Sequence, residues 1–174
     1  MPGGGWLAQT VRVCDPQISL SAEYYVCGSS GSGVSGRVLF ESQGNSTKIT
    51  ARVSGLTPGQ HGFHIHELGD LTEGCKTAKG HYNPFGMTHA GPQDTVRHVG
   101  DLGNITANAD GVATIEMVDS KVQLNGTESV IGRSVVVHAG TDDLGRGGHV
   151  DSLTTGHAGG RVACGVIGIG NSKM

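Results

Sequence analysis

The sequence predicts an all-β protein with a closed or two-sheet antiparallel architecture, and three observations support this fold class. Glycine accounts for 31 of the 174 residues and is dispersed without a collagen period, which indicates many turns. Aromatic residues make up only 4%, so the core must consist mainly of Val, Ile, Leu and Ala packed in a pleated sheet. From Glu23 onward, short β-like runs alternate with clusters of Gly, Ser, Asn and Asp, a pattern typical of sandwiches and barrels.

Eight segments have the length and composition of strands, and no helix-period stretch of normal length competes with them. The predicted strands are Glu23–Cys27, Val34–Glu41, Thr47–Ser54, Gly62–Glu67, Asn104–Ala107, Gly111–Val118, Ser134–His138 and Arg161–Ile169. Two long segments, Leu68–Leu102 and Ala139–Gly160, do not read as strands. Loops of this length in a compact domain are usually functional, so we expect the chemistry there.

The length favours one domain, which we expect over residues 23–174. Residues 1–22 contain Arg12, Asp15 and two prolines, and their longest apolar run is Trp6–Ala8. A secretory signal needs an apolar stretch of about seven residues or more, so this segment is a poor signal peptide. We expect a disordered N-terminal extension and a cytoplasmic protein, in which the three Asn-X-Thr sequons at Asn45, Asn104 and Asn125 arise by chance.

The overall charge excludes some partners. The formal net charge is −3 and the isoelectric point is about 6.3, so the chain lacks the basic footprint of a nucleic-acid-binding protein. No run approaches the 18 apolar residues of a membrane span. We therefore expect neither a nucleic acid nor a membrane as partner, and an anionic substrate would need local positive charge.

Six of the nine histidines form an interpretable set, beginning with the tightest pair. In the run from Phe63 to His66, a period of two places His64 and His66 on one face of a strand, with Phe63 and Ile65 on the other. A metal site and two half-exposed histidines on a polar strand face are equally open for this motif alone.

A second group lies in the loop between Gly80 and Gly103, where His81, His89, His98 and Asp101 follow one another. Three imidazoles and one carboxylate complete a tetrahedral zinc site, which would be structural because it has no vacant position. The alternative is a set of solvated loop histidines.

His138 is the last residue of a strand-like valine run, so we expect it to lie at the end of a strand, where the long second loop begins. Alone, it could be a core histidine. Imidazole-rich sites suit copper, whereas the carboxylate of Asp101 fits zinc better, so the donor types suggest two different metals.

Four motifs resemble the copper/zinc superoxide dismutase family in order and spacing over roughly Tyr25 to Gly170. They are GFHIHE (62–67), GHYNP (80–84), RHVGDLGN (97–104) and GRVACG (160–165), with Gly132-Arg133 and Asp142-Asp143-Leu144-Gly145 between them. The resemblance implies an eight-stranded antiparallel Greek-key barrel or sandwich with two long functional loops.

The resemblance also implies two metal ions that share one ligand. The implied copper ligands are His64, His66, His81 and His138, and the implied zinc ligands are His81, His89, His98 and Asp101. Asp142 matches an aspartate that hydrogen-bonds the residues corresponding to His64 and His89, which fixes tautomer and ring orientation. Cys75 and Cys164 match the disulfide of the family, which persists even in the cytosol, and Cys14 and Cys27 are then expected to be free.

The implied activity converts superoxide to dioxygen and hydrogen peroxide by alternate reduction and oxidation of copper, as an antioxidant defence. His81 is the implied proton donor. Arg161 matches an arginine beside the copper that attracts and orients the anion, and its alternative role is a surface salt bridge. A homodimer through Ile131-Gly132 and Val166–Ile169 is expected, and a copper chaperone is a possible partner.

The chain departs from the family in the segment His149–His157, which contains no Lys or Arg where related loops usually carry a lysine. We expect attraction of the anion to depend on Arg161 and Arg146, and the rate to fall less steeply with salt than in lysine-bearing relatives. His149 and His157 could add positive charge below about pH 6.5, or could be inert solvated residues.

Two other functional classes stay open at this stage. One is the dismutase-like domain of a copper chaperone, which typically lacks some copper ligands and has a metal-transfer CxC, whereas this chain has all the ligands and no CxC. The other is a zinc-stabilised binding module with a vestigial copper site.

Overall fold

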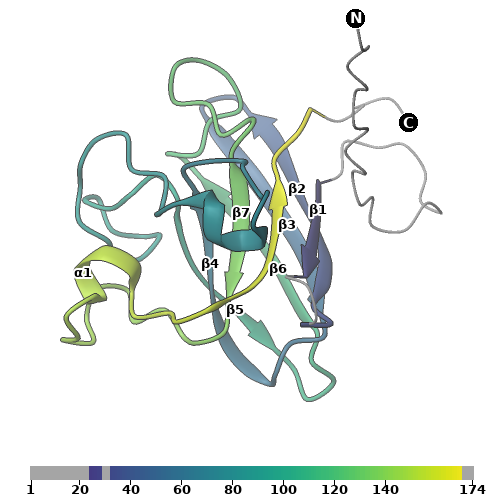
Figure 1. The fold of residues 1–174 in the computed structure, drawn as a ribbon. Coiled ribbons are helices and arrows are strands. Elements are labelled where there is room, and N and C mark those ends of the chain that lie inside the picture. The colour runs from purple at the N-terminus through teal and green to yellow at the C-terminus, as the bar shows by residue number, and fades with distance from the viewer. Residues whose placement is uncertain (1–23, 29–31, 170–174) are drawn as a thin grey trace, which may run out of the picture.

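The computed structural model describes residues 24–28 and 32–169, and it contains eight strands and two very short helices (Figure 1). The strands are β1 (Tyr24–Gly28), β2 (Ser35–Gln43), β3 (Ser46–Ser54), β4 (Gly59–His66), β5 (Asp101–Ala107), β6 (Ala113–Asp119), β7 (Ser134–His138) and β8 (Arg161–Val166). A 3₁₀ helix, η1 (Gly74–Ala78), lies in the first long loop, and a single helical turn, α1 (Ser152–Thr155), lies in the second.

The strands form a closed barrel in the order β1-β2-β3-β6-β5-β4-β7-β8, and all pairings are antiparallel. Strands β4, β5 and β6 are consecutive neighbours, and β7 returns by a long connection to lie beside β4. This arrangement is a Greek key. The predicted fold class is therefore confirmed, with eight strands close to the expected segments.

Most strand boundaries lie within two residues of the prediction, and the three largest differences, of three residues each, have identifiable reasons. β4 begins at Gly59, because residues 59–62 pair with β5 through a glycine-containing stretch that has no β-strand propensity of its own. β5 begins at Asp101, because this polar residue pairs with His64 of β4. β8 ends at Val166, although the Ile167 N–H still donates to the carbonyl of Arg133 at 2.8 Å.

The hydrophobic core consists mainly of aliphatic side chains with a few aromatic ones, as the scarcity of aromatic residues predicts. Phe63 and Ile65 of β4 and Val135 and Val137 of β7 are inaccessible to solvent and belong to one hydrophobic cluster. Because side chains alternate along a strand, the residues between them project from the outer surface of the barrel. The outer surface of β4 and β7 thus carries His64, His66, Val136 and His138.

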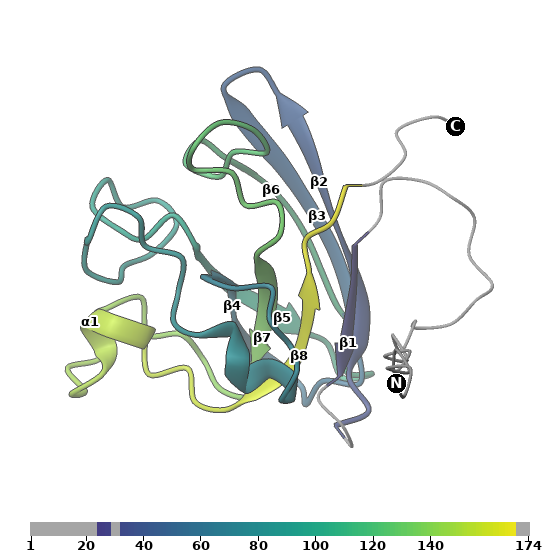
Figure 2. The same ribbon diagram turned by 45° about the horizontal axis from the view of Figure 1, so that its top comes forward.

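The two long loops cover this outer surface. Val136 packs against Cys75 and Ala78 of η1 and against Cys164 of β8 in a small separate cluster. Figure 1 and Figure 2 both place α1 and the loops on the side of β4 and β7, away from β1, β2 and β3. The space between barrel wall and loops is where the predicted metal ligands meet.

Part of the sequence prediction falls outside the described residues. The predicted extension over residues 1–22 lies there, as does Cys14, and only the backbone of Cys27 is described. Within residues 24–28 and 32–169, no helix is both long and apolar enough to cross a membrane.

Candidate metal centre

Three of the predicted ligands come from the outer face of two neighbouring strands. β4 pairs with β7 so that His66 faces Ser134 and Phe63 faces Val137, which brings the end of β7 alongside the two histidines of β4. The ring centroid of His138 lies 4.9 Å from that of His64 and 5.4 Å from that of His66. All three side chains are buried.

His81 joins this group because the first long loop runs beside β4. His81 forms an isolated β-bridge with His66, and the Tyr82 N–H donates to the carbonyl of Ile65 at 2.8 Å. Gly100 closes the same contact from the other side, and a Cβ at this position would collide with the Ile65 carbonyl oxygen. The imidazole of His81 is consequently held 4.0 Å from that of His64, centroid to centroid.

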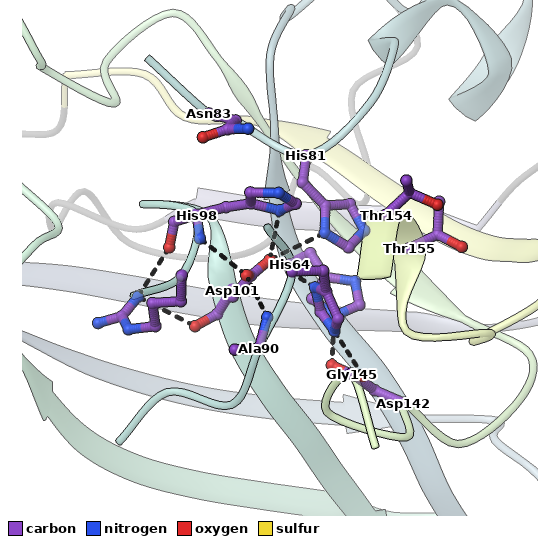
Figure 3. Close-up of polar contacts among 12 residues, drawn as sticks. His64, His81, Asn83, Ala90, His98, Asp101, Asp142, Gly145, Thr154 and Thr155 are labelled. Carbon is purple, nitrogen blue, oxygen red and sulfur yellow. Dashed lines mark hydrogen bonds and ion pairs between the residues drawn. The ribbon is translucent and has the colours of Figure 1, made fainter. Parts of the chain in front are cut away.

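Asp101 organises the second predicted group. Its Oδ1 lies 2.9 Å from His81 Nδ1, 2.9 Å from His89 Nδ1 and 3.0 Å from His98 Nδ1. Its Oδ2 accepts hydrogen bonds from the backbone N–H groups of Ala90 and His98. Figure 3 shows this carboxylate with His81, His98 and Ala90 directed toward it.

The structure brings the predicted ligands into two groups of four that share His81. In each group the potential ligand atoms lie within 4.8 Å of one another. The first, here called the all-histidine group, consists of His64, His66, His81 and His138. The second, here called the carboxylate group, consists of His81, His89, His98 and Asp101.

The remaining ring nitrogens contact oxygen atoms of the protein. The partners are the Asp142 carboxylate for His64 Nε2 (2.8 Å) and His89 Nε2 (2.8 Å), and the carbonyls of Lys79 for His66 Nδ1 (2.9 Å), Gly159 for His138 Nδ1 (3.1 Å) and Met87 for His98 Nε2 (3.0 Å). A carbonyl oxygen only accepts, so the contacting nitrogen is the donor. Each of these rings therefore turns its other nitrogen toward the shared space.

The inward nitrogens of the all-histidine group lack partners, which tests whether a metal fits. Among the described residues, His64 Nδ1 and His81 Nε2 are buried without a hydrogen bond. His66 Nε2 and His138 Nε2 lie 3.3 Å apart, and both carry lone pairs when the rings are neutral. Buried, unpaired acceptors are unfavourable, and a cation among them would satisfy all four. The donor set suits copper or zinc.

The pKa values of the all-histidine group favour the neutral, metal-binding form. Burial lowers the pKa of His64, His66 and His81, and it lowers the pKa of His138 to about 4. These imidazoles are thus free of competing protons at neutral pH.

The carboxylate group has the opposite electrostatics. Burial acts to lower the pKa of His89, but hydrogen bonds to Asp101 and Asp142 outweigh it and raise the pKa to about 9. Hydrogen bonds from His81, His89 and His98 to Asp101, and from His64 and His89 to Asp142, overcome burial and hold the pKa of both carboxyls below the usual range. His89 touches oxygen acceptors with both nitrogens, so it carries two protons in the metal-free protein. A divalent cation would replace the proton that faces Asp101.

Asp142 joins the two groups from outside. Its Oδ2 contacts His64 and its Oδ1 contacts His89, and Figure 3 shows it beneath His64. Asn104 holds the Asp142 backbone through hydrogen bonds to both its N–H and its carbonyl. Gly156, at φ 65°, caps α1 against this bridge, where a Cβ would collide with the Asp142 carboxylate.

Arg161 lies beside the all-histidine group and is held by backbone oxygens. Its guanidinium donates to the carbonyls of Cys75, at 2.6 Å, and Lys79. Cys75 is bonded to Cys164, which confirms the predicted disulfide and ties η1 to β8. Arg161 therefore forms no salt bridge with the described residues, and its charge faces no carboxylate.

The other residues expected to attract an anion are engaged elsewhere. Arg146 forms a two-point ion pair with Asp94, both contacts being 2.8 Å. His149 and His157 stack with ring centroids 3.7 Å apart, and His157 Nδ1 lies 2.7 Å from Asp151. Both imidazoles thus have partners in the loop that carries α1.

The sequence did not predict the side chains and backbone carbonyls that orient the metal ligands. The Asn83 side chain pairs with both the N–H and the carbonyl of Met87, whose carbonyl contacts His98. His61 is buried, and its Nδ1 lies 2.9 Å from the carbonyl of His138. Backbone carbonyls have no residue signature, whereas Asn83 stands within a quoted motif and could have been noticed.

A comparison with known families agrees with this geometry. The family model for copper/zinc superoxide dismutase matches residues 34–167, a span that contains both groups, Asp142, Arg161 and the disulfide. The match extends over most of the 174 residues, and the Greek-key barrel is the fold that the resemblance implied. The chain belongs to the copper/zinc superoxide dismutase family.

Proposed function

We propose that the protein dismutates superoxide, with copper held by the all-histidine group and zinc held by the carboxylate group. Two superoxide anions and two protons give one dioxygen and one hydrogen peroxide. Copper, when bound, supplies the alternating one-electron oxidation and reduction. Zinc has no redox chemistry of its own, which fits a closed carboxylate group with a structural role.

The observation that carries this proposal is the double role of His81. Its Nδ1 lies 2.9 Å from Asp101, while its Nε2 is buried without a partner in the all-histidine group. One imidazole thus offers a separate nitrogen to each group. A single metal site would not require both nitrogens of one ring to be directed at ligand clusters.

The remaining residues bind the anion and move protons. Arg161 is permanently charged and presents a planar set of donors, so it binds and orients a small anion beside the all-histidine group. His81 Nε2 is the atom at which this chain would hold a proton for the product, because Nδ1 stays fixed on Asp101. Asp142 keeps His64 and His89 in position.

The proposal is tested by superoxide decay with protein loaded with copper and zinc. We expect rapid decay by the unaltered protein and the loss of nearly all activity in His138→Ala, with zinc retained on elemental analysis. His149→Ala, an exposed histidine outside both groups, is the control and should keep full activity. Equal rates for the His138→Ala variant and the unaltered protein would contradict the copper assignment.

We also propose a homodimer in the cytoplasm, supplied with copper by a chaperone. Exposed apolar side chains at Val166 and Ile169, 43% and 87% accessible, support an interface at the end of β8. Sedimentation of a Val166→Glu variant beside the unaltered chain tests it, and a monomer in both would contradict it. The domain is proposed to extend over residues 23–174.

A further inference from the structure

The proposed activity needs positive charge near the copper ligands, and the expected sources are depleted in this chain. The net charge is −3, and the segment His149–His157 has no Lys or Arg. Arg146 is neutralised by its two-point contact with Asp94. Arg161 provides one charge, and the neighbouring loop carries two exposed lysines, Lys76 within η1 and Lys79 directly after it, of which Lys79 is the one whose backbone contacts the site.

Lys79 lies at the C-terminal end of η1. Its carbonyl lies 2.9 Å from His66 Nδ1 and also accepts a hydrogen bond from the Arg161 guanidinium. The backbone of Lys79 therefore connects a predicted copper ligand with the anion-binding arginine. The side chain is exposed, and an exposed charge acts over about one Debye length, about 10 Å at 0.1 M salt.

The backbone of Lys79 is unusual for a lysine. Its φ is 67° and its ψ is −150°, a region that essentially only glycine occupies without strain. A lysine side chain at this position is therefore retained at a cost to stability. Strain of this kind is characteristic of functional sites, where a side chain serves activity and not folding.

The ammonium of Lys79 is also free to act on an approaching anion. Within residues 24–28 and 32–169 it forms no ion pair. Asp70, an acidic residue that interacts electrostatically with Lys79, instead accepts hydrogen bonds from the backbone N–H and the hydroxyl of Thr72. Asp70 therefore offsets the charge of Lys79 only in part, without an ion pair, and the exposed ammonium faces solvent.

We infer that Lys79 is the second anion-attracting residue of this site, and that the loop containing η1 supplies the charge that the segment His149–His157 lacks. This inference rests on the proposed function. It makes Lys79 a steering residue, which acts on the substrate's approach and not on the metals. A positive charge near the site attracts an anion whether the loop containing η1 or the segment His149–His157 carries it.

Four variants separate charge from backbone strain. Lys79→Gln removes only the charge, Lys79→Arg keeps it, and Lys79→Gly removes charge and strain together. Arg52→Gln removes an exposed charge from β3, on the far side of the barrel, as the matched control. All are measured as metal-loaded protein with the disulfide intact.

The expected result is a superoxide-decay rate about two-fold lower for Lys79→Gln and Lys79→Gly at low salt, which is the effect of one unit charge about 10 Å away in water. The difference should vanish at high salt. Azide, a small anion that binds copper, should bind about two-fold more weakly to both variants. Lys79→Arg and Arg52→Gln should match the unaltered protein.

Stability gives an independent readout. Lys79→Gly should raise the Tm by about 3 °C through relief of strain, whereas Lys79→Gln should leave it unchanged. Unchanged rate, salt dependence and azide affinity in Lys79→Gln would overturn the steering role, and an unchanged Tm in Lys79→Gly would overturn the strain. Failure of the proposed function is distinct, because the unaltered protein would then consume no superoxide.

Discussion

The all-histidine group and the carboxylate group share one imidazole, yet the chain tunes them in opposite directions. In the first, burial lowers the pKa values of His66 and His138 and outweighs their hydrogen bonds to backbone carbonyls, which act to raise them, so these rings are neutral. In the second, Asp101 and Asp142 dominate and raise the pKa of His89 to about 9. His64 and His81 each contact one carboxylate and keep lowered pKa values, whereas His89 contacts a carboxylate with each ring nitrogen and has a raised pKa.

This contrast separates the functions expected of the two groups. A carboxylate that gathers three imidazoles makes a closed site that fixes a loop. Four imidazoles without a carboxylate among the ligands make a site whose net charge changes with the metal. The raised pKa of His89 depends on both Asp101 and Asp142, so removing either charge should bring that pKa closer to the lowered values of the all-histidine group.

The largest effect is expected when Asp101 loses its charge. Asp101→Asn leaves the buried His89 with Asp142 as its one remaining carboxylate partner, and removal of one partner of a buried ion pair costs about 3–5 kcal/mol. The variant should lose zinc during dialysis against a chelator, and unfolding of the metal-free form by denaturant should show the destabilisation. Asp110→Asn, in an exposed turn, is the control. Full zinc retention would contradict the role of Asp101.

Acid and alkali should destabilise the metal-free protein through different groups. The folded pKa of His138 is about 4, against about 6.5 when unfolded, so its contribution is complete above pH 6.5 and is lost as the pH falls through 4. The loss is about 3 kcal/mol. His89, with a folded pKa of about 9, contributes fully below pH 6.5 and loses its contribution as the pH rises through 9.

Denaturant unfolding from pH 4 to pH 9.5 measures both limbs. We expect maximal stability near pH 6.5. In His89→Gln the alkaline decline should become smaller while the acid decline persists. A stability that rises steadily up to pH 9 would contradict the charged state assigned to His89.

An intermediate effect is expected at the residue that joins the groups. Asp142→Asn keeps the shape but cannot accept equally from His64 and His89, and loss of such an orienting partner lowers metal affinity about 10- to 100-fold. Competition with chelators should show weaker binding of both copper and zinc. Weakening of only one metal would show that Asp142 does not link the groups. Asp143→Asn is a poor control because Asp143 accepts from Ser152, so Asp110→Asn serves again.

The smallest effect is expected at Asn83, which acts through a carbonyl. Asn83→Ala frees Met87, whose carbonyl orients His98, so zinc affinity should fall about ten-fold, at the lower end of the range for orienting residues. Copper affinity should be unchanged, because the all-histidine group does not contact Met87. Asn83→Asp retains one acceptor for the Met87 N–H and should be intermediate.

The sequence predicted the barrel well because local patterns determine it. Alternation in β4 assigned Phe63 and Ile65 to the interior and His64 and His66 to the outer face, as observed. Boundaries were less accurate where tertiary pairing extends a strand through residues of low β-propensity, as at Gly59 and Asp101.

The ligand sets were predicted from motifs, whereas the support of the ligands was not. The carbonyls of Lys79, Met87 and Gly159 hold imidazoles, and any residue can provide a carbonyl. The engagement of Arg146 by Asp94 depends on two loops meeting, which spacing does not encode. The charge of the chain could be counted, but which charges remain unpaired required the structure.

The most direct test of the account is anomalous diffraction from crystals of the metal-loaded protein, at energies on each side of the copper and zinc absorption edges. We predict two peaks that share His81, with copper at the Nε2 side among His64, His66 and His138, and zinc at the Nδ1 side with Asp101. One peak, the same metal at both positions, or a His81 that contacts only one ion would contradict the central claim.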